Sequence, residues 1–378
     1  MEMETEAQTQ TPTPTEKGEG RFTLVTRNLQ EVLGKDRLRE LLSDPRSEPV
    51  VYWGTAPTGR IHIAYIGCLL KVADLVEAGC RVKILVADLH AYLDNMKSTL
   101  PELEARTTYY IEMIRRILLR LNVDVGRVEF VKGTSFQLSP EYTMDVYRAN
   151  SLTTYHEARH AGAEVVRQTD NPTMNALLYP TLQALDMEYL KADAFLGGVD
   201  QRKINVLGLE LLPKLGYRKG VYLMAGMVPG LQTAKGGSGS GAGPAPASAK
   251  MSSSDKGSKI DILDSKDVIR KNINQSYCLV GDAVDNTPLM VAEKLVFPVL
   301  AHLGLSFVIN RPAKFGGPIT YHVTDFERLR DDFGAKRLHP ADFKLGLSDA
   351  IDTIVAPIRT AFEDEDLRKL LGVAYPDP

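Results

Sequence analysis

Cysteine, long apolar runs and targeting signals are all scarce in this sequence. Its three cysteines, Cys68, Cys80 and Cys278, lie far apart and match neither a zinc-ligand spacing nor an even-numbered disulfide set. We therefore expect a reducing compartment. No uninterrupted apolar stretch reaches the roughly 18 residues that a membrane-spanning helix needs. Residues 1–20 lack both the apolar core of a signal peptide and the arginines of a transit peptide, which predicts a cytoplasmic protein without a membrane anchor.

The chain also lacks an excess of charge of either sign. It has 45 Lys and Arg residues against 48 Asp and Glu residues, a formal net charge of −3. No global positive field attracts polyanions, so any contact with nucleic acid must come from local patches. The hydrophobic fraction of 44% is enough for well-formed cores, and 378 residues allow two ordinary domains or one large one.

The first part of the chain divides into a tail and a helical pattern. Residues 1–20 are acidic, rich in Thr, Pro and Gln, and almost without large apolar side chains, so they predict a disordered tail. In residues 26–42, "TRNLQEVLGKDRLRELL", leucine and valine recur at spacings of three and four. This spacing predicts amphipathic helical turns.

Short apolar runs then alternate with long helical patterns. The runs "VVYWGT", "RVKILVADLHAYL" and "VEFVKGTSF" are rich in β-branched residues, and between them lie "AYIGCLLKVADLVEAG" and "PELEARTTYYIEMIRRILLRLNV". Strands that alternate with helices favour parallel pairing. We therefore predict a Rossmann-like α/β domain over residues 21–262.

Further helical segments complete the chain. Residues 139–152 form one pattern with Ser139 as its cap and Pro140 at its first position, and a second helical segment ends at Gly197 and Gly198. Beyond about residue 263 the pattern is mainly helical, in "SKDVIRKNINQSYC", "PLMVAEKLVFPVLAHLG" and "HPADFKLGLSDAIDTIVAPIRTAFE". Residues 263–378 therefore predict a separate helical domain.

The first candidate site is a turn within residues 51–70, "VYWGTAPTGRIHIAYIGCLL". An apolar strand leads through a Gly, Pro and Thr turn to His62, near the start of a helix. Such a turn offers backbone N–H groups and a favourable helix dipole to a phosphate. The same pattern also fits an ordinary turn with a surface histidine.

The second candidate site is one face of a helix. Tyr179, Gln183 and Asp186 stand at positions i, i+4 and i+7, bordered by leucines. A polar stripe of this kind either faces solvent or lines a polar pocket. In the following "GGVDQRK", Gly197 and Gly198 permit close backbone approach, and Asp200 suits ribose hydroxyls.

The third candidate site follows a spacer-like stretch. Residues 236–249 consist of Gly, Ser, Ala and Pro, and "KMSSS" comes directly after them. Lys250 and the hydroxyls of Ser252–Ser254 could reach a polyphosphate from a mobile segment. In isolation, the pentad fits the end of a spacer equally well.

Taken together, the motifs and their order resemble those of class I aminoacyl-tRNA synthetases. The order is a HIGH-type turn, an amino-acid helix, a ribose motif and a KMSKS-type loop. Over about residues 25–362 the chain resembles tyrosyl-tRNA synthetases of the archaeal and eukaryotic cytosolic type, through "VADLHAYLDNMK", "AGAEVVRQ", "YPTLQALD", "GGVDQRK", "MVPGL", "KMSSS" and "SKIDILD". The resemblance implies that tyrosine is attached to tRNA(Tyr) in two steps, with ATP and Mg²⁺ entering as substrate and no tightly bound cofactor or protein metal ligands.

The resemblance also implies roles for individual residues. The phenol of the substrate would meet Tyr52 and Asp186, and the rest of the tyrosine would meet Tyr179, Gln183 and Gln201. The expected catalytic residues are His62, Lys250, Ser252, Ser253 and Ser254. The expected ATP-binding residues are Gly54, His62, Gly197, Gly198, Asp200, Met227, Val228 and Lys250.

Two further regions have implied partners. Phe315, His339 and Asp342 match the positions that hold the first anticodon base of tRNA, although a core phenylalanine and a helix-capping aspartate fit the same residues. Residues 133–190 contain the family's connective region, which implies a homodimer interface.

Two departures from the family motifs bear on these expectations. Ala64 and Tyr65 replace the glycine and second histidine of the HIGH-type site, and Ser253 replaces the second lysine of the loop; each change removes a possible phosphate donor. Residues 236–249 look like an insertion, and an appended C-terminal domain found on some eukaryotic relatives is expected to be absent.

Two other functions remain open at this point. A tryptophanyl-type synthetase shares the fold and the motif order, although Asp186 with Tyr52 favours a ligand that carries a hydroxyl. A catalytically inactive relative that binds RNA is the other alternative. Every expected substrate position is occupied, which argues against it.

Overall fold

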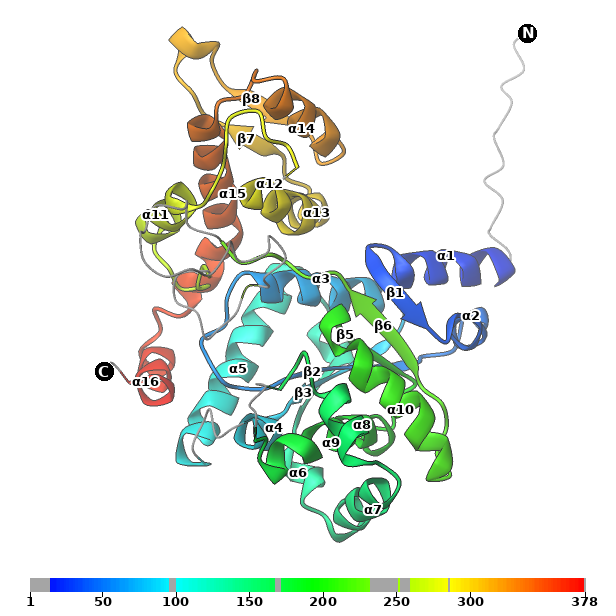
Figure 1. The fold of residues 1–378 in the computed structure, drawn as a ribbon. Coiled ribbons are helices and arrows are strands. Elements are labelled where there is room, and N and C mark those ends of the chain that lie inside the picture. Colours follow the sequence, from blue (N-terminus) through cyan, green and yellow to red (C-terminus); the bar gives the residue numbers. More distant parts are fainter. Residues whose placement is uncertain are drawn as a thin grey trace, which may run out of the picture.

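A six-stranded sheet forms the centre of the α/β part of the molecule (Figure 1). The computed structural model describes residues 14–94, 100–166, 171–231, 251, 259–284 and 286–376. The strand order is β1-β6-β5-β2-β3-β4, and all neighbours are parallel except the antiparallel pair β1 and β6. The strands are β1 (Leu29–Leu33), β2 (Val50–Thr55), β3 (Arg81–Val86), β4 (Val128–Lys132), β5 (Ala194–Gly198) and β6 (Val221–Ala225). The predicted Rossmann-like α/β fold is confirmed.

The strand order reverses at β2. The chain runs outward from β2 to β3 and β4, then returns to β5 and β6 on the other side, so that Tyr52 pairs with Lys83 and Phe195. Ligands of open α/β sheets bind beyond the carboxyl ends of the strands at such a reversal. The carboxyl ends of β2 and β5 are therefore the expected place for a site.

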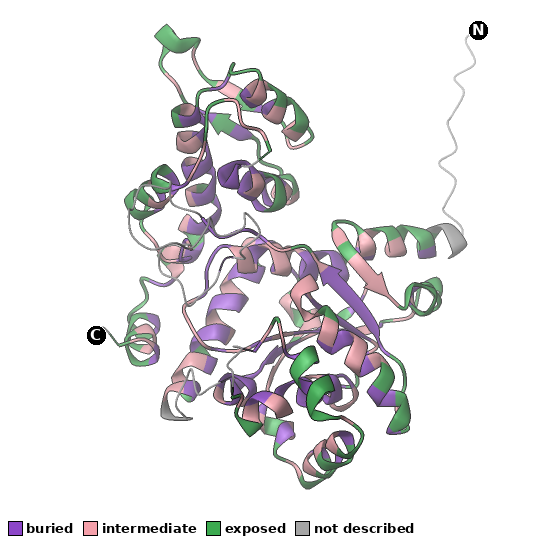
Figure 2. Ribbon diagram, in the orientation of Figure 1, coloured by how far each residue is buried: buried purple, intermediate pink, exposed green. Residues whose placement is uncertain are grey.

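Helices cover both faces of the sheet because the strands bury both faces. In β2, Val51 and Trp53 join one buried core while Tyr52 joins the other, as the alternation of a strand requires. The central strands are accordingly buried (Figure 2). The first core contains α3 (Ala64–Glu77) and α5 (Leu100–Arg120), and the second contains α9 (Met174–Tyr189) and α10 (Arg202–Lys214).

Side-chain caps begin several helices where the sequence indicates them. The Ser139 hydroxyl accepts from the backbone N–H of Tyr142 at 3.2 Å, which confirms the predicted cap of α7 (Pro140–Ser151). Thr154 caps α8 (Tyr155–Ala161) in a capping box, and Thr173 caps α9. Each cap satisfies a backbone donor that the first helical turn leaves unpaired.

The last third of the chain is mainly helical, as predicted. A short antiparallel pair, β7 (Phe307–Ile309) and β8 (Ile319–Tyr321), was not expected from the sequence. Figure 1 shows these elements, in yellow to red, gathered beside the α/β part. The helices are α11 (Lys266–Gln275), α12 (Thr287–Val291), the π-helical turn η3 (Ala292–Val296), α13 (Phe297–His302), α14 (Phe326–Gly334), α15 (Pro340–Ala361) and α16 (Glu365–Ala374).

The C-terminal helices share a core with α5. The Arg120 side chain donates to the Ile354 carbonyl at 3.2 Å, and Arg106 donates to the Ala374 carbonyl at 3.1 Å. The Tyr375 ring lies 5.2 Å from the Tyr109 ring. One buried cluster consequently runs from the sheet into α15 and α16. A domain boundary near residue 262 remains a prediction.

Two segments differ from the sequence-based expectation. Leu29–Leu33 is a strand rather than helical turns, and only Lys35–Ser43 forms a helix, α2. Gly34, with φ of 83°, separates the two because this left-handed conformation suits glycine. The helical segment predicted to end at Gly197 and Gly198 instead stops at Tyr189, and these glycines end strand β5.

The N-terminal tail is partly helical. Residues 14–20 lie in α1 (Pro14–Thr26), whereas residues 1–13 of the expected disordered tail are outside the described residues. The Arg21 side chain holds α1 against the segments that follow α2 and α3. It donates to the backbone carbonyls of Ala78, Asp44 and Ser47 at 2.6, 2.7 and 2.8 Å.

A buried lysine closes the other end of α1. The Lys71 ammonium donates to the carbonyls of Leu24, Val25 and Arg27, at 3.2, 3.3 and 2.7 Å. It also pairs with Asp74 at 2.6 Å. Burial lowers the pKa of Lys71, and the Asp74 carboxylate opposes that change. The ammonium thus satisfies carbonyls that the last turn of α1 leaves unpaired.

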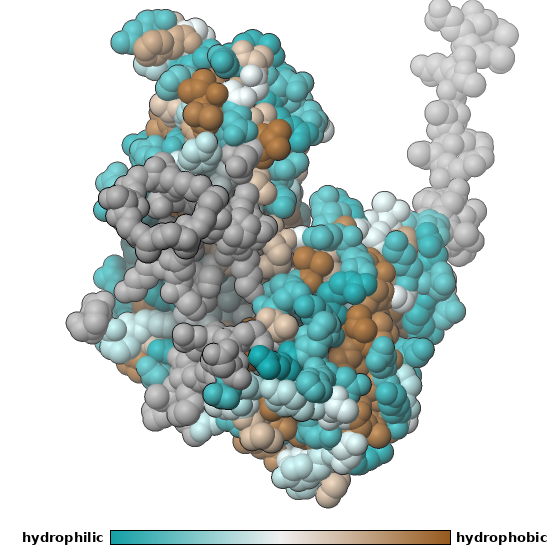
Figure 3. Space-filling view, viewed as in Figure 1, coloured by the Kyte–Doolittle hydropathy of each residue, from teal (hydrophilic) through white to brown (hydrophobic). Residues whose placement is uncertain are grey.

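The surface shows no broad apolar face in the view of Figure 3. Apolar side chains gather there in small patches among hydrophilic ones. Within the described ranges, no helix is long and apolar enough to cross a membrane.

Candidate active site

A cavity of about 220 Å³ lies at the carboxyl ends of β2 and β3, beside α9. The structure brings together there all five residues that the resemblance assigns to the tyrosine substrate, and Gly54 of the HIGH-type turn lines the same cavity. The five are Tyr52, Tyr179, Gln183, Asp186 and Gln201. The polar stripe of α9 therefore lines a pocket rather than facing solvent.

Asp186 is the most buried acidic group of this cavity, with 1% of its surface exposed. Its Oδ1 atom accepts hydrogen bonds from the Tyr142 hydroxyl and the Gln137 amide, each at 2.8 Å. Burial raises the pKa of Asp186 to about 7, against the lowering effect of these two hydrogen bonds. Its Oδ2 atom has no hydrogen-bond partner among the described residues. This oxygen is therefore ready to accept from a ligand.

Tyr52 brings a neutral phenol to the same wall. Its hydroxyl donates to the Gln183 carbonyl at 3.3 Å, and its ring packs against Phe195 at 4.9 Å. Burial, with a smaller effect from the Asp186 charge, raises the pKa of Tyr52 well above its usual value. The Gln183 amide donates to Gln201 at 2.6 Å, which fixes both amides at the cavity wall.

Three residues around Asp186 were missed by the sequence reasoning. His90 lies on α4 (Asp88–Leu93) after β3, Gln137 on α6 (Thr134–Gln137) after β4, and Tyr142 on α7. Burial lowers the pKa of His90 to about 4, so its imidazole is neutral at pH 7. A search of the segments that follow each strand's carboxyl end could have found His90 and Gln137.

His62 lies in the turn that follows β2, outside the set of residues that line the cavity. It is buried, which excludes an ordinary surface histidine. Burial, with a smaller effect from the Lys259 charge, lowers its pKa to about 3, so it is neutral. Backbone hydrogen bonds join its neighbours to the segment after the KMSKS-type loop: Ile63 to Ile260 at 3.0 Å and Ile262 to Ile61 at 3.2 Å.

The residues expected at ribose lie at the end of β5, and those expected at adenine follow the end of β6. Asp200 belongs to the short helical turn η2 (Val199–Gln201). A Cβ atom on Gly198 would lie 2.4 Å from the Asp200 carboxylate and 3.0 Å from the Met227 sulfur, so only glycine allows both to approach. Val228 is buried beside Met227 and accepts from the backbone N–H of Met251 at 3.1 Å. Gly197 lies at the end of β5. Lys250 and Ser252, Ser253 and Ser254 lie outside the described residues.

The residues expected at the anticodon lie far from the cavity in the sequence. Phe315, in the turn η4 (Ala313–Phe315), is 58% exposed, which excludes a core phenylalanine. His339 is exposed and caps α15 by accepting from the Ala341 backbone N–H at 3.2 Å. Asp342, in the first turn of α15, is therefore not the capping residue.

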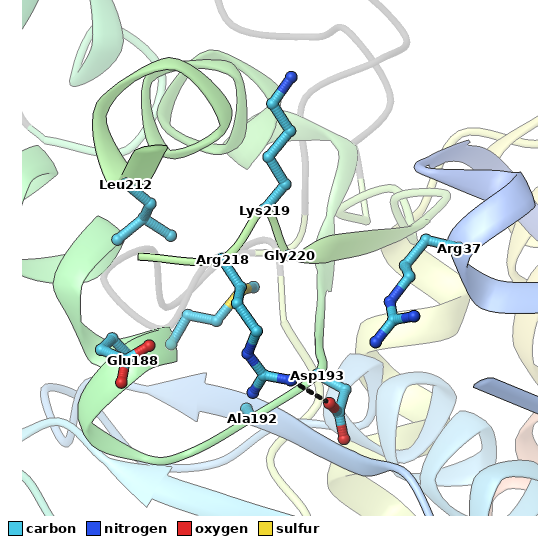
Figure 4. A pocket seen from close by; sticks show the side chains of 9 residues that line it. Arg37, Glu188, Ala192, Asp193, Leu212, Arg218, Lys219 and Gly220 are labelled. Atoms are coloured by element: carbon cyan, nitrogen blue, oxygen red, sulfur yellow. Dashed lines mark ion pairs between the residues drawn. The ribbon is translucent and has the colours of Figure 1, made fainter. Parts of the chain in front are cut away.

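Another cavity lies at the opposite end of the strands, near the residues that precede β5 and β6. Its volume is about 30 Å³, and Arg218 pairs there with Asp193 at 3.6 Å, beside Arg37 and Lys219 (Figure 4). This volume suits a water molecule rather than a substrate. In the part of the chain that the structure describes, no cluster of three or more His, Cys, Asp or Glu side chains could hold a metal ion.

Comparison with known proteins identifies relatives over most of the chain. The family model for class I tRNA synthetases (W and Y) matches residues 44–356. The cytoplasmic tyrosine–tRNA ligase of Danio rerio is 48% identical over 358 residues, which are 95% of this chain and 63% of that protein. The protein of the same name from Saccharomyces cerevisiae is 42% identical over 360 residues, 94% and 87% of the two chains. This chain thus spans just under two thirds of the length of its vertebrate relatives.

Solved structures give the same picture. Tyrosyl-tRNA synthetase complexed with L-tyrosine from Archaeoglobus fulgidus superposes with a TM-score of 0.78 at 34% identity, over 91% of this chain and 99% of that chain. Tryptophanyl-tRNA synthetase from Aeropyrum pernix K1 reaches a TM-score of 0.65 at 15% identity, over 90% and 83%. This second likeness shows the shared fold alone.

Proposed function

The chain belongs to the class I tRNA synthetases for tryptophan and tyrosine, and we propose that it is a tyrosine–tRNA ligase, which attaches L-tyrosine to tRNA(Tyr) at the expense of ATP. The names of its relatives place them in the cytoplasm, and we assign this chain to cytoplasmic translation on that ground. The identity of 42–48% to tyrosine–tRNA ligases favours tyrosine over tryptophan as the substrate.

The unpartnered Oδ2 atom of Asp186, beside Tyr52, is the observation that carries this proposal. A buried carboxylate oxygen that lacks a partner favours a ligand that donates a hydrogen bond, such as a phenol. Phenylalanine would leave the Oδ2 atom of Asp186 unpaired. A site of this kind rejects a ligand without the hydroxyl by about 10⁴- to 10⁵-fold.

The first step would join tyrosine to the nucleotide. An oxygen of the tyrosine carboxylate attacks the α-phosphorus of ATP, the bond to the bridging oxygen breaks, and pyrophosphate leaves. A carboxylate is already ionised at pH 7, so the step needs alignment and charge stabilisation rather than a general base. In the second step, a ribose hydroxyl of the tRNA 3′-terminal adenosine attacks the tyrosyl carbonyl, and AMP leaves.

The nucleotide would lie along the ends of β2 and β5. The close packing of Gly198, Asp200 and Met227 supports a ribose and adenine site there. Because His62 is neutral, it would act on the phosphates as a hydrogen-bond donor rather than as a cation. Positive charge would come from Lys250 and from the Mg²⁺ that enters with ATP.

The anticodon of tRNA would bind at the C-terminal helices. The exposed Phe315 ring, with the Lys314 ammonium 5.0 Å from its centre, supports stacking on an unpaired base. His339 and Asp342, at the start of α15, offer an imidazole and a carboxylate for base edges.

A second copy of the chain would cover the connective region. Within residues 133–190, several large apolar side chains are exposed, and exposed apolar groups that gather in one region are typical of an interface. They are Leu138, Met144, Tyr147, Leu152, Tyr155 and Met174. Sedimentation equilibrium should give the mass of a dimer, and Tyr147→Glu should shift it toward the monomer.

Amino-acid-dependent pyrophosphate exchange tests the proposed activity. We expect exchange with tyrosine and none with tryptophan or phenylalanine, followed by tyrosylation of purified tRNA(Tyr). Exchange with tryptophan would establish the tryptophanyl alternative. Binding of tRNA without adenylate formation would establish the inactive relative.

A further inference from the structure

The wall of the cavity holds two buried polar atoms that face each other without a partner. The Nε2 atom of His90 and the Oδ2 atom of Asp186 lie 3.8 Å apart, too far for a hydrogen bond between them. Neither atom has a hydrogen-bond partner among the described residues, although the two side chains are only 3% and 1% exposed. Both residues line the 220 Å³ cavity. Unpaired buried atoms are costly, so this pair points to a ligand atom between them.

The hydrogen bonds of Gln137 determine which of the two atoms is the donor. The Gln137 amide nitrogen lies 2.8 Å from Asp186 Oδ1 and 3.3 Å from His90 Nδ1. This nitrogen carries two hydrogens and cannot accept, so the Nδ1 atom of His90 accepts. Because the buried imidazole is neutral, its one proton is on Nε2. The cavity therefore presents one donor, His90 Nε2–H, and one acceptor, Asp186 Oδ2.

A hydroxyl is the group that satisfies both atoms at once. We propose that His90 is a specificity-determining residue, whose Nε2–H donates to the phenol oxygen of the substrate while the phenol proton is donated to Asp186 Oδ2. This inference rests on the proposed tyrosine ligase function and refines its substrate recognition. A phenol oxygen carries one hydrogen and two lone pairs, so it can donate to Asp186 and accept from His90 at the same time.

An amine in place of the hydroxyl separates the two contacts. The amino group of 4-aminophenylalanine donates to Asp186 as a phenol does, but it is a poor acceptor for His90. Loss of the imidazole should therefore lower kcat/KM for tyrosine more than kcat/KM for 4-aminophenylalanine. A merely structural role of His90, or a water that stays between the two atoms, would affect both amino acids equally.

Pyrophosphate exchange with the two amino acids makes this test. In His90→Leu we expect kcat/KM for tyrosine to fall roughly 2- to 12-fold, and that for 4-aminophenylalanine to stay within about twofold. The matched control is His322→Leu, because His322 is exposed and lies in the C-terminal part of the chain. It should change neither value. An equal loss for both amino acids would overturn the inference, whereas a wild-type protein inactive with tyrosine would overturn the proposed function instead.

Nuclear magnetic resonance of the unaltered protein gives an answer that does not depend on how a variant folds. With ¹⁵N-labelled histidine, the spectrum should show that His90 is the tautomer protonated at Nε2. Addition of L-tyrosine without ATP should change the chemical shift of that Nε2 proton. L-Phenylalanine at the same concentration should not. The His90 signal is assigned by its loss in His90→Gln. A tautomer protonated at Nδ1, or a Nε2 proton whose chemical shift does not change when tyrosine is added, would refute the proposal.

Discussion

Removing the Tyr142 hydroxyl should make tyrosine binding depend more strongly on pH. In the proposed complex the Oδ2 atom of Asp186 accepts from the phenol of tyrosine, and this requires the ionised form, because Oδ1 is held by two donors and a proton would go to Oδ2. Burial nevertheless raises the pKa of Asp186 to about 7. The Tyr142 hydroxyl stabilises the ionised form through its 2.8 Å hydrogen bond. A hydrogen bond to a charged group is worth about 1.5–3 kcal/mol, which corresponds to roughly one to two pKa units. In Tyr142→Phe the pKa of Asp186 should therefore rise to about 8–9.

The size of the effect on affinity follows from the ionised fraction. At pH 7 this fraction should fall from about one half to between about one tenth and one hundredth, so the Kd for tyrosine should rise roughly 5- to 50-fold. Affinity for tyrosine should fall as the pH falls. The pKa of Asp186 is raised, and the ionised form that binds tyrosine is lost as the pH falls through that pKa. At pH 9 the ratio of the variant Kd to the wild-type Kd should shrink to about one or two.

Equilibrium dialysis with labelled tyrosine between pH 6 and 9 measures this ratio directly. The control is Tyr321→Phe, because the Tyr321 hydroxyl also donates to a carboxylate, that of Asp332 at 2.9 Å, but in the C-terminal part of the chain. The control should bind tyrosine as the wild type does at every pH. A Tyr142→Phe ratio that stays constant across this range would refute the role assigned to Asp186 ionisation.

Three further substitutions test other parts of the molecule. Lys71→Met should lower the free energy of unfolding in urea by about 3 kcal/mol, since it leaves Asp74 buried with one partner fewer, whereas the exposed Lys369→Met should cost under about 0.5 kcal/mol. Phe315→Ala should lower kcat/KM for tRNA by roughly 5- to 100-fold while pyrophosphate exchange stays unchanged; equal tyrosylation would contradict the stacking role. Lys250→Ala should slow adenylate formation on the order of 100-fold in single turnovers with little change in tyrosine affinity, and an unchanged rate would exclude its role.

The parallel strands were predictable because the apolar residues within each strand indicate which of its faces are buried. The run that became β2 is apolar on both faces, and so is Ile84–Val86 of β3, as strands covered by helices on both sides must be. The charged Glu129 and Lys132 fit the place of β4 at the edge of the sheet. Leu29–Leu33 was not predictable in this way, since its spacing fits helical turns equally well. Its strand state depends on pairing with β6, which lies far along the chain. The three-residue strands β7 and β8 are too short to leave a pattern.

The candidate site was predictable where it follows one helix. Tyr179, Gln183 and Asp186 fall on one face of α9 because their spacing matches the helical period. His90, Gln137 and Tyr142 come from three other helices, and only the folded sheet brings them to Asp186. The shift of the Asp186 pKa could not be read from the sequence either, because it arises from the burial that this assembly creates.

The packing of α16 against α5 has a consequence for shortening or recombining this chain. Tyr375, just beyond α16, and Tyr110 of α5 both donate to the Gly59 carbonyl, at 3.0 and 2.6 Å, in the turn between Gly54 and His62. A fragment cut near residue 262 would remove Tyr375 and expose the apolar side of α5 that α15 and α16 cover. The excised α/β part should therefore aggregate or lose the shape of this turn, and exchange of C-terminal parts between relatives should succeed only where α5 is exchanged with them.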